Sequence, residues 1–349
     1  MRKPALIVCL VPALLVGLAC LCPGSQAATS VAKGSDTPET GATPIQGALP
    51  LPEATATLPP RPAATLAPQP TVASSHPGGQ IVFVSCKSQN PLAGGTQCGL
   101  FLMDADGSGL RQLTNVDGDS EPSLSPDGTR VAFDSSKRDG DYEIYLIHTD
   151  GSGLVRLTTH PGNDLHPGWS PDGNQISYIS CSGLSNCSIS VVGADGSNPH
   201  PLFKTDANFF DWSPDGRQIV FAAAKTLNII NADGTNVRLI TTQTQFVYSP
   251  VWSPDGGKIA FLVQKTKDGP VELDVIDEGG TNQRSLTAGY YVIYGGLSWS
   301  PDGQMLLFTM NGDGRSTKGA SQVYIVNADG SGLHKLDVPC TYCYAGDWR

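Results

Sequence analysis

Charged residues are scarce in this chain, and helical periodicity is missing from it. Only 15% of its 349 residues are charged, whereas it contains 40 glycines and 27 prolines. No apolar pattern with a helical period runs for a useful length, which excludes a stack of helical pairs. Little charge together with many turn residues is typical of a β protein with many short strands.

Basic residues are fewer than acidic ones. Of the 22 Lys and Arg and the 32 Asp and Glu, only 4 and 3 precede residue 81, which leaves 18 against 29 in residues 81–349. An acidic domain lacks the positive patch that nucleic acids require, and anionic lipid would repel it. We therefore expect no nucleic-acid partner and no adsorption of the domain to membranes.

Catalytic motifs are also missing. The nearest match to a Gly-x-Ser-x-Gly nucleophile elbow is residues 168–172, which is a repeat turn. The glycine-rich stretches show no phosphate-loop pattern, and residues 104–107 lack the distal glutamate of a calcium loop. We expect no enzymatic activity and no cofactor.

Residues 1–27 predict an export signal. Arg2 and Lys3 precede a short apolar run, and small residues ending at Ala27 form a signal-peptidase site. The run is short and contains prolines, which argues against a membrane-spanning helix. As an alternative processing point, Cys20 ends a segment that resembles a lipoprotein box, so lipidation there would anchor the chain to a membrane.

Residues 28–80 predict an unfolded tether. Ten prolines lie between Pro38 and Pro77, mixed with Ala and Thr and almost without aromatic residues. Such a segment cannot bury enough apolar surface to fold. The single folded domain is therefore expected over residues 81–349.

One tetrapeptide, Ser-Pro-Asp-Gly, occurs five times, at steps of 45, 43, 40 and 47 residues. Its copies begin at Ser125, Ser170, Ser213, Ser253 and Ser300. Four of the five tryptophans directly precede these serines, namely Trp169, Trp212, Trp252 and Trp299. A turn that recurs at a near-constant period predicts one structural unit copied in series.

Each unit contains several predicted strands. Apolar strands such as Val131-Ala132-Phe133 follow the turn, and a second turn of the Asp-Gly type comes about twenty residues later. Proline, aspartate and glycine suit the successive positions of a type I turn with a following positive φ. We predict an all-β fold, a β-propeller of four-stranded antiparallel blades.

The ends of the repeat region predict the number of blades. The first unit begins at Ile81 and lacks a tryptophan strand, whereas Trp348 lies in a tryptophan strand that no blade follows. The C-terminal strand is therefore expected to complete blade 1. This closes a six-bladed ring without an open sheet edge.

These motifs carry a family resemblance. Trp-Ser-Pro-Asp-Gly, then a strand of the Ile-Ala-Phe type, then Ile-Tyr and Ala-Asp-Gly resemble the WD-like repeats of TolB-like propellers throughout residues 81–349. The resemblance implies a propeller that binds partners at the cell envelope. TolB has a separate α/β domain ahead of its propeller, and this chain has the proline-rich tether in that place.

Six cysteines outside the signal form three local pairs. They are Cys86 with Cys98, Cys181 with Cys187, and Cys340 with Cys343. In an exported protein, an even set of neighbouring cysteines predicts disulfides. The last pair has the spacing of a redox motif, but that motif needs a helix start and this segment lies between strands.

The loops that carry these cysteines share one face with the connections between blades, opposite the short turns. Long and variable loops are where recognition is expected. Our candidate partner-binding residues on this face are Asp119, Glu121, Asp164, His166, Phe209, Phe210, Tyr248, Tyr290, Tyr291, Tyr294 and Tyr344. Aromatic residues on a rim of loops suit stacking on sugars or anchoring a peptide.

Three functions follow as hypotheses. The first is an exported, non-enzymatic, monomeric propeller, periplasmic or extracellular, that binds an envelope protein, a peptide or a cell-wall glycan. The second is a metal-dependent lyase or hydrolase with His160 and His166 as ligands, because the repeat also resembles oligogalacturonate-lyase propellers. The third is a purely structural envelope module.

Overall fold

The computed structural model describes residues 78–89, 95–183, 186–243, 245–267, 269–312, 314–315, 320–338 and 340–349. All of them fall within one compact unit, residues 70–349. The predicted signal (1–27) and nearly all of the predicted tether (28–80) lie outside the described residues. Across the described ranges, no helix is long and apolar enough to cross a membrane.

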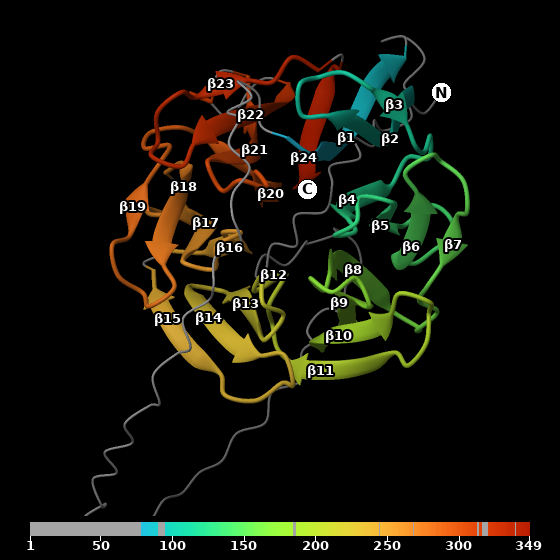
Figure 1. Ribbon diagram of the computed structural model, residues 1–349, viewed down its shortest axis with the longest axis horizontal. Helices are drawn as coiled ribbons and strands as arrows, with labels where there is room; N and C mark the ends of the chain where they lie inside the picture. Colours follow the sequence, from blue (N-terminus) through green and yellow to red (C-terminus); the bar gives the residue numbers. More distant parts are fainter. Residues whose placement is uncertain are drawn as a thin grey trace, which may run out of the picture. The chain divides into compact units, whose positions relative to one another are not determined.

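The described chain forms six four-stranded antiparallel sheets around a common axis, which confirms the predicted propeller (Figure 1). The strands nearest the axis are β4 (Asp119–Leu124), β8 (Asn163–Trp169), β12 (Phe209–Trp212), β16 (Val247–Trp252), β20 (Val292–Trp299) and β24 (Tyr342–Trp348). The second strands are β5 (Arg130–Ser135), β9 (Gln175–Cys181), β13 (Gln218–Ala223), β17 (Lys258–Gln264), β21 (Met305–Asn311) and β1 (Gln80–Gln89).

The two remaining positions of each blade hold the third and the outer strands. The third strands are β6 (Glu143–His148), β10 (Cys187–Gly193), β14 (Thr226–Asn231), β18 (Val271–Asp277), β22 (Ser321–Asn327) and β2 (Gly95–Asp104). The outer strands are β7 (Val155–Arg156), β11 (His200–Lys204), β15 (Arg238–Thr242), β19 (Arg284–Ser285), β23 (His334–Lys335) and β3 (Arg111–Gln112). Blade 1 contains β1 to β3, and blades 2 to 6 follow in chain order.

The C-terminal strand closes the ring as predicted. β24 pairs with β1 in blade 1, from Ile81 opposite Trp348 to Cys86 opposite Tyr342. The first folded residues lie slightly before the expected boundary, because the indole N–H of Trp348 donates to the carbonyl of Gly78 at 3.2 Å. Closure by strands from both ends of the described chain leaves no blade incomplete.

The five Ser-Pro-Asp-Gly turns share one hydrogen-bond pattern. In each, the serine hydroxyl donates to the aspartate at 2.6–2.7 Å and accepts the backbone N–H five residues on. The aspartate also accepts a backbone N–H two residues on. The turn glycines have φ between +68° and +71°, which only glycine adopts without strain. The motif is therefore explained by local backbone chemistry.

The motif tryptophans fill the interfaces between blades. All five tryptophan side chains are buried, at 1% to 7% exposure. Trp169 donates its indole N–H to the carbonyl of Ser123 in blade 2, and Trp299 donates to Val251 in blade 5. Because each indole packs on the preceding blade, the repeat stabilises its neighbour as well as itself.

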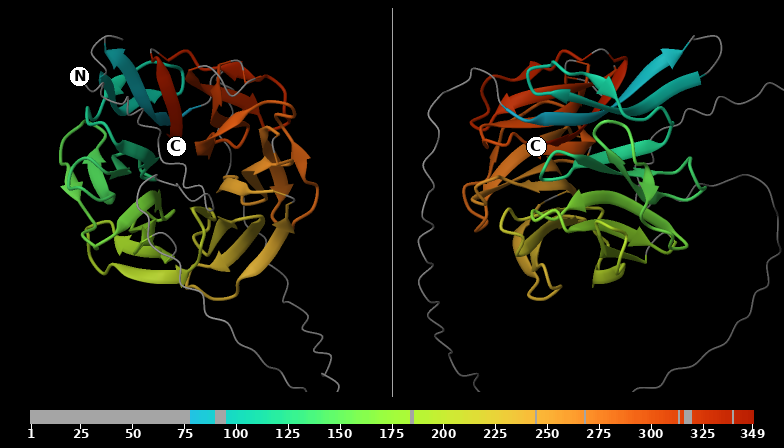
Figure 2. Two further views of the ribbon diagram at one scale, coloured as in Figure 1. Left: turned by 180° about the vertical axis from the view of Figure 1, so that it is seen from behind. Right: turned by 45° about the vertical axis from the view of Figure 1, so that its right-hand side comes forward.

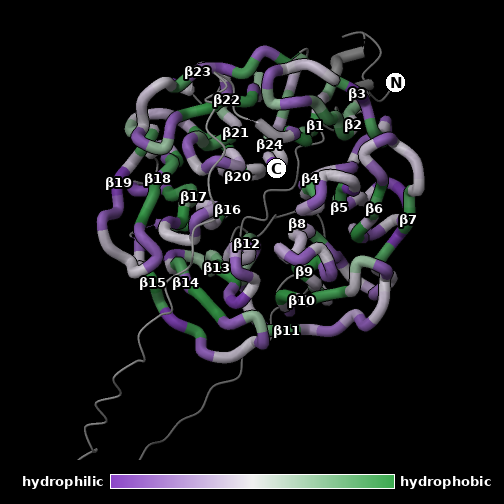
Figure 3. The backbone as a smooth tube through the Cα atoms, viewed as in Figure 1, coloured by the Kyte–Doolittle hydropathy of each residue, from purple (hydrophilic) through white to green (hydrophobic). Residues whose placement is uncertain are grey.

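The apolar residues gather in the middle strands of each blade (Figure 3). Phe83, Phe133, Phe261 and Phe308, from four second strands, have at most 1% exposure. The outer strands are short and largely hydrophilic, as the purple segments show. The core therefore consists of blade-to-blade layers.

All three predicted disulfides are present. Cys86–Cys98 and Cys181–Cys187 each join the second and third strands of one blade, near the loop end. Cys343 lies opposite Ser85, so the third pair neighbours the first in blade 1. We call this side the disulfide face and the opposite side the turn face. The long β1–β2 hairpin projects from the ring (Figure 2).

Candidate binding site

Three inner strands carry a bulge at the residue before a proline. Glu121, His166 and Ser249 have φ values of +46°, +54° and +45°, and the strand register shifts beside each of them. A residue before proline is kept out of the helical region, and a bulge turns a side chain away from the regular pleat. The sequence contains this signal, a residue followed by proline and then, two residues later, by Trp or Leu, but we had not used it.

The bulges bring side chains from four successive blades into contact. The Nδ1 of His166 lies 3.8 Å from an Oε of Glu121, and its ring centroid lies 4.6 Å from that of Phe209. Phe209 in turn meets Tyr248 edge-on at 6.5 Å. All four are partly exposed. We call Glu121, His166, Phe209 and Tyr248 the axial arc, because they belong to the inner strands β4, β8, β12 and β16 (Figure 1).

A buried carboxylate lies behind the arc. Asp134 on β5 is 1% exposed and accepts hydrogen bonds from the hydroxyl of Ser120 and from the backbone N–H of His166, the latter at 2.9 Å. Burial raises the pKa of Asp134 to about 6, although the nearby imidazole opposes the shift. Our site prediction missed this residue, whose signal is an acidic side chain within an apolar strand.

The electrostatic environment of His166 follows from these contacts. Burial by itself would lower the pKa of His166, but the carboxylates of Glu121 and Asp134 outweigh it and raise the pKa above the ordinary value. At 3.8 Å the contact with Glu121 exceeds hydrogen-bond range, and the buried Nδ1 has no hydrogen-bond partner among the described residues. The arc therefore contains an imidazole that holds its proton to a higher pH than an ordinary histidine.

Two predicted acidic residues are buried beside the arc. Asp119 is 2% exposed and forms a two-pronged ion pair with Arg138, at 2.7 and 3.1 Å, and also accepts the hydroxyl of Ser135. Asp164 occupies the equivalent position of blade 3 with 0% exposure. Burial raises the pKa of Asp164. Neither carboxylate is part of the exposed surface.

Among the described side chains, none of the other predicted aromatic residues has a ring contact with the arc. Phe210 packs toward Gly168 of the preceding blade, and Tyr290 packs in the blade 5–6 core near Gly314. Tyr344 lies half-buried against the blade 1–2 core. The remaining two are Tyr291, which is half-buried, and Tyr294, which lies in β20 with a side chain outside the described part.

Two aspartates outside the predicted site connect blades near the turn face. Asp347 accepts the backbone N–H of Leu124 at 3.0 Å and the hydroxyl of Ser298 at 2.9 Å, and pairs with Arg349 at 3.1 Å. Asp211, at the same position before a tryptophan, accepts the N–H of Trp252 from the next blade, at 2.8 Å. Asp211 is half-buried, and burial raises the pKa of its carboxyl to about 7.

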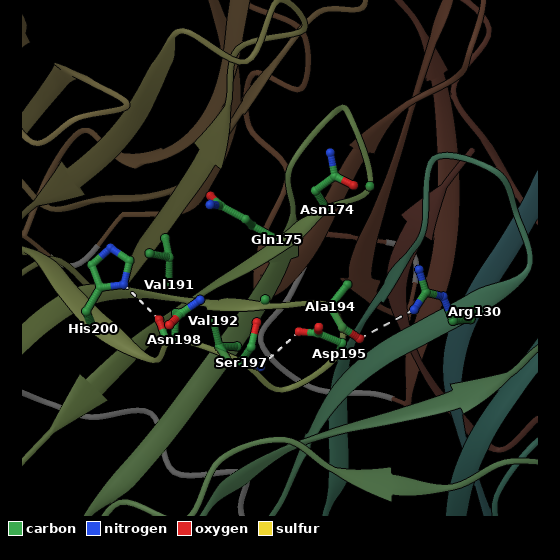
Figure 4. A pocket seen from close by; sticks show the side chains of 12 residues that line it. Arg130, Asn174, Gln175, Val191, Val192, Ala194, Asp195, Ser197, Asn198 and His200 are labelled. Carbon is green, nitrogen blue, oxygen red and sulfur yellow. Dashed lines mark hydrogen bonds between the residues drawn. The ribbon is translucent and has the colours of Figure 1, made fainter.

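A shallow polar groove of about 420 Å³ lies on the turn face of blade 3 (Figure 4). Arg130 reaches it from blade 2, with its guanidinium 4.7 Å above the indole of Trp169. His200 and Asp195 point into it, and their polar atoms bond to the neighbouring turn. These side chains already have partners within the turns, so the groove is a by-product of the repeat geometry.

The serine and histidine candidates for catalysis have other roles or positions. Ser170, the serine of the elbow-like sequence, is 5% exposed and its hydroxyl is held by the turn. His160 is exposed and forms no part of the arc. Among the residues that the structure describes, no three His, Cys, Asp or Glu side chains are grouped to hold a metal ion.

Family models and solved structures match this architecture. Residues 95–228 match the tricorn protease N-terminal β-propeller domain, and residues 222–342 match the TolB β-propeller domain. No curated protein matches the chain. The fold and the repeats define the chain as a six-bladed β-propeller protein.

Solved TolB structures are similar to this propeller in fold. TolB from Acinetobacter baumannii aligns with a TM-score of 0.67 and 20% identity, covering 79% of this chain and 68% of its own. A putative TolB from Agrobacterium tumefaciens gives 0.58 and 16%, covering 77% and 91%. A chain of a nidogen/laminin complex gives 0.58 and 11%, covering 76% and 97%. The protein carries a TolB-like propeller.

Proposed function

We propose that this protein is an exported, non-enzymatic scaffold that binds a segment of a partner protein or a peptide at the axial arc. The observation that carries the proposal is the contact of four partly exposed side chains from four blades on the disulfide face. A site assembled from several repeats of a rigid ring is preorganised, which reduces the entropic cost of binding.

The chemistry of the arc favours a peptide over a reaction. Two aromatic rings offer a large contact area with few rotatable bonds, which is the composition of binding hot spots. Phe246, which is 37% exposed and lies 6.2 Å from Tyr248, extends this aromatic surface. The alternative of a metal-dependent lyase or hydrolase needs a group of metal ligands, and the described residues contain no group of three candidates. A propeller of similar fold is present in the nidogen/laminin complex, which is an assembly of proteins.

Three disulfides support export, because such bonds persist in oxidising compartments. The signal at residues 1–27 and the tether at 28–80 complete the proposal of a periplasmic or extracellular protein. The mass of the mature N-terminus distinguishes cleavage after Ala27 from lipidation at Cys20. An uncleaved N-terminus would contradict export.

The binding proposal is tested by selecting a random peptide library on the full chain. We expect Phe209→Ala combined with Tyr248→Ala to weaken the selected peptides at least about 30-fold, as loss of a hot spot does. Tyr342→Ala is the matched control, because this aromatic residue is 39% exposed on the same face but lies outside the arc. Equal binding by both variants would contradict the arc, and failure to select any peptide would contradict the partner class.

A further inference from the structure

The acidic side chains on the disulfide face differ in their counter-ions. Asp119 is neutralised by Arg138, and that guanidinium also stacks on Phe133 and Tyr145 at 5.5 and 5.4 Å. Glu121, two residues along the same strand, contacts no Lys or Arg among the described residues. Its side chain is 28% exposed, so it faces both the protein and the solvent. Of these two carboxylates, Glu121 is therefore the one that a partner can reach.

The field around Glu121 favours a positive charge. Asp134 adds a second carboxylate behind His166, and burial keeps that charge from being screened by solvent. Gly295 of blade 6 also approaches Glu121, because a Cβ at this glycine would lie 3.6 Å from an Oε of Glu121. The whole folded domain is acidic, which extends the attraction beyond the arc.

The aromatic part of the arc has matching chemistry. Phe209 stands next to His166 in the arc, and Tyr248 meets the ring of Phe209 edge-on. The face of an aromatic ring attracts cations, and the attraction grows where water is partly excluded. A carboxylate and an aromatic ring that contact the same imidazole suit an ammonium or guanidinium group that carries an apolar stem.

We propose that the arc recognises a lysine or arginine side chain of the bound segment, held between Glu121 and Phe209, and that a proton on His166 competes with it. This inference rests on the proposed function and specifies the chemistry of its ligand. The partner's cation would take the place of the single weak ion pair that the arc forms within the protein.

The competition predicts a direction for the pH dependence. The groups that face His166 are Glu121 from β4, Asp134 from β5 and the uncharged ring of Phe209 from β12. As pH falls through the raised pKa of His166, the imidazolium neutralises Glu121 and repels the partner's cation. Binding of a basic segment should therefore weaken on acidification.

The test uses peptides selected on the wild-type chain that fail to bind Phe209→Ala/Tyr248→Ala. We expect a Lys or Arg in each, and its replacement by Met to weaken binding about tenfold at pH about 8, the combined effect of an ion pair and a cation–π contact. Glu121→Gln should weaken the basic peptide by the same factor and leave its Met analogue unchanged. Glu278→Gln, an equal charge change at an exposed site on the turn face, is the control.

A second readout separates recognition from folding. The affinity of the basic peptide should fall several-fold between pH about 8 and about 6, and His166→Gln should reduce this dependence to the part that protonation of Asp134 contributes. Arc-dependent peptides without a basic residue, or full affinity in Glu121→Gln, would overturn the inference while the binding function stands. Failure to obtain any arc-dependent peptide would overturn both.

Discussion

Asp211 and Asp347 offer a matched test of how the ring is held together. Both residues directly precede a tryptophan on an inner strand, in blades 4 and 1. Asp347 joins its blade to Leu124 of blade 2 and Ser298 of blade 6, whereas Asp211 accepts a single N–H from blade 5. Replacing each by asparagine keeps the shape of the side chain and removes its charge. The structure predicts opposite results.

The expected magnitude for Asp347→Asn follows from its contacts. Asparagine offers one acceptor oxygen, so either the N–H of Leu124 or the hydroxyl of Ser298 loses its partner, and Arg349 loses its ion pair. A lost hydrogen bond to a charged group costs about 1.5–3 kcal/mol, and a buried donor left unpaired costs about as much. We expect the free energy of unfolding to fall by about 2–3 kcal/mol, or Tm by about 4–10 °C.

The expectation for Asp211→Asn comes from its raised pKa. The native carboxyl holds its proton up to about pH 7, whereas the unfolded one ionises near its ordinary value. The wild type therefore loses stability as pH rises from the unfolded to the folded pKa. Asparagine has no such loss and can still accept the N–H of Trp252. The variant should equal or exceed the wild type at pH about 8 and lose that advantage near pH about 4.

Guanidinium unfolding followed by tryptophan fluorescence measures both variants at the two pH values. The five buried tryptophans lie between blades, so their emission reports separation of the ring. Equal destabilisation by the two substitutions at the higher pH would refute the reasoning, because it would mean that the number of interblade contacts does not matter. An advantage of Asp211→Asn that persists unchanged near pH about 4 would refute the assigned protonation.

Three further predictions concern the turns and the disulfides. Gly216→Ala should cost about 1–2 kcal/mol, because its φ of +69° excludes a side chain; Gly279→Ala, at an exposed turn without positive φ, should cost nothing measurable in thermal melting. The hydroxyl of the turn serine lowers the pKa of Asp127 to about 2, so its stabilisation is lost as pH falls toward that value; Asp127→Asn should flatten this acid limb of stability. Cys181→Ser with Cys187→Ser should lower the free energy of unfolding by about 2 kcal/mol, and an unchanged midpoint would mean that this bond does not constrain the unfolded chain.

Much of the scaffold could be predicted because its signals are local. A Ser-Pro-Asp-Gly turn contains all the atoms of its own hydrogen-bond network, so the sequence of Ser213 to Gly216 specifies its geometry. The pairing of Cys181 with Cys187 is local in the same sense, since both flank one hairpin. The strand at Trp348 has the tryptophan that blade 1 lacks, and this match predicted how the ring closes.

The candidate site could be predicted only as a set of residues on one face. Glu121, His166, Phe209 and Tyr248 were all named, but so were Asp119 and Asp164, which are buried. The alternation of a regular strand places Asp119 and Glu121, two residues apart, on the same face. The bulge at Glu121 breaks this alternation, so that Asp119 is buried and Glu121 is partly exposed. Asp134 could not be predicted as a site residue because its role depends on contact with His166 of the next blade, whose backbone N–H donates to it.

The sequence by itself determined the propeller, its six blades, its closure and its disulfides, since each of these depends on short-range turn chemistry repeated along the chain. Only the tertiary structure decided which of the predicted residues meet around the axis and which are buried in the core. Those outcomes depend on distances between blades about 40 residues apart in sequence, which close packing and the positive-φ bulges set together. The partner-binding chemistry therefore follows from packing that the repeat motif does not encode.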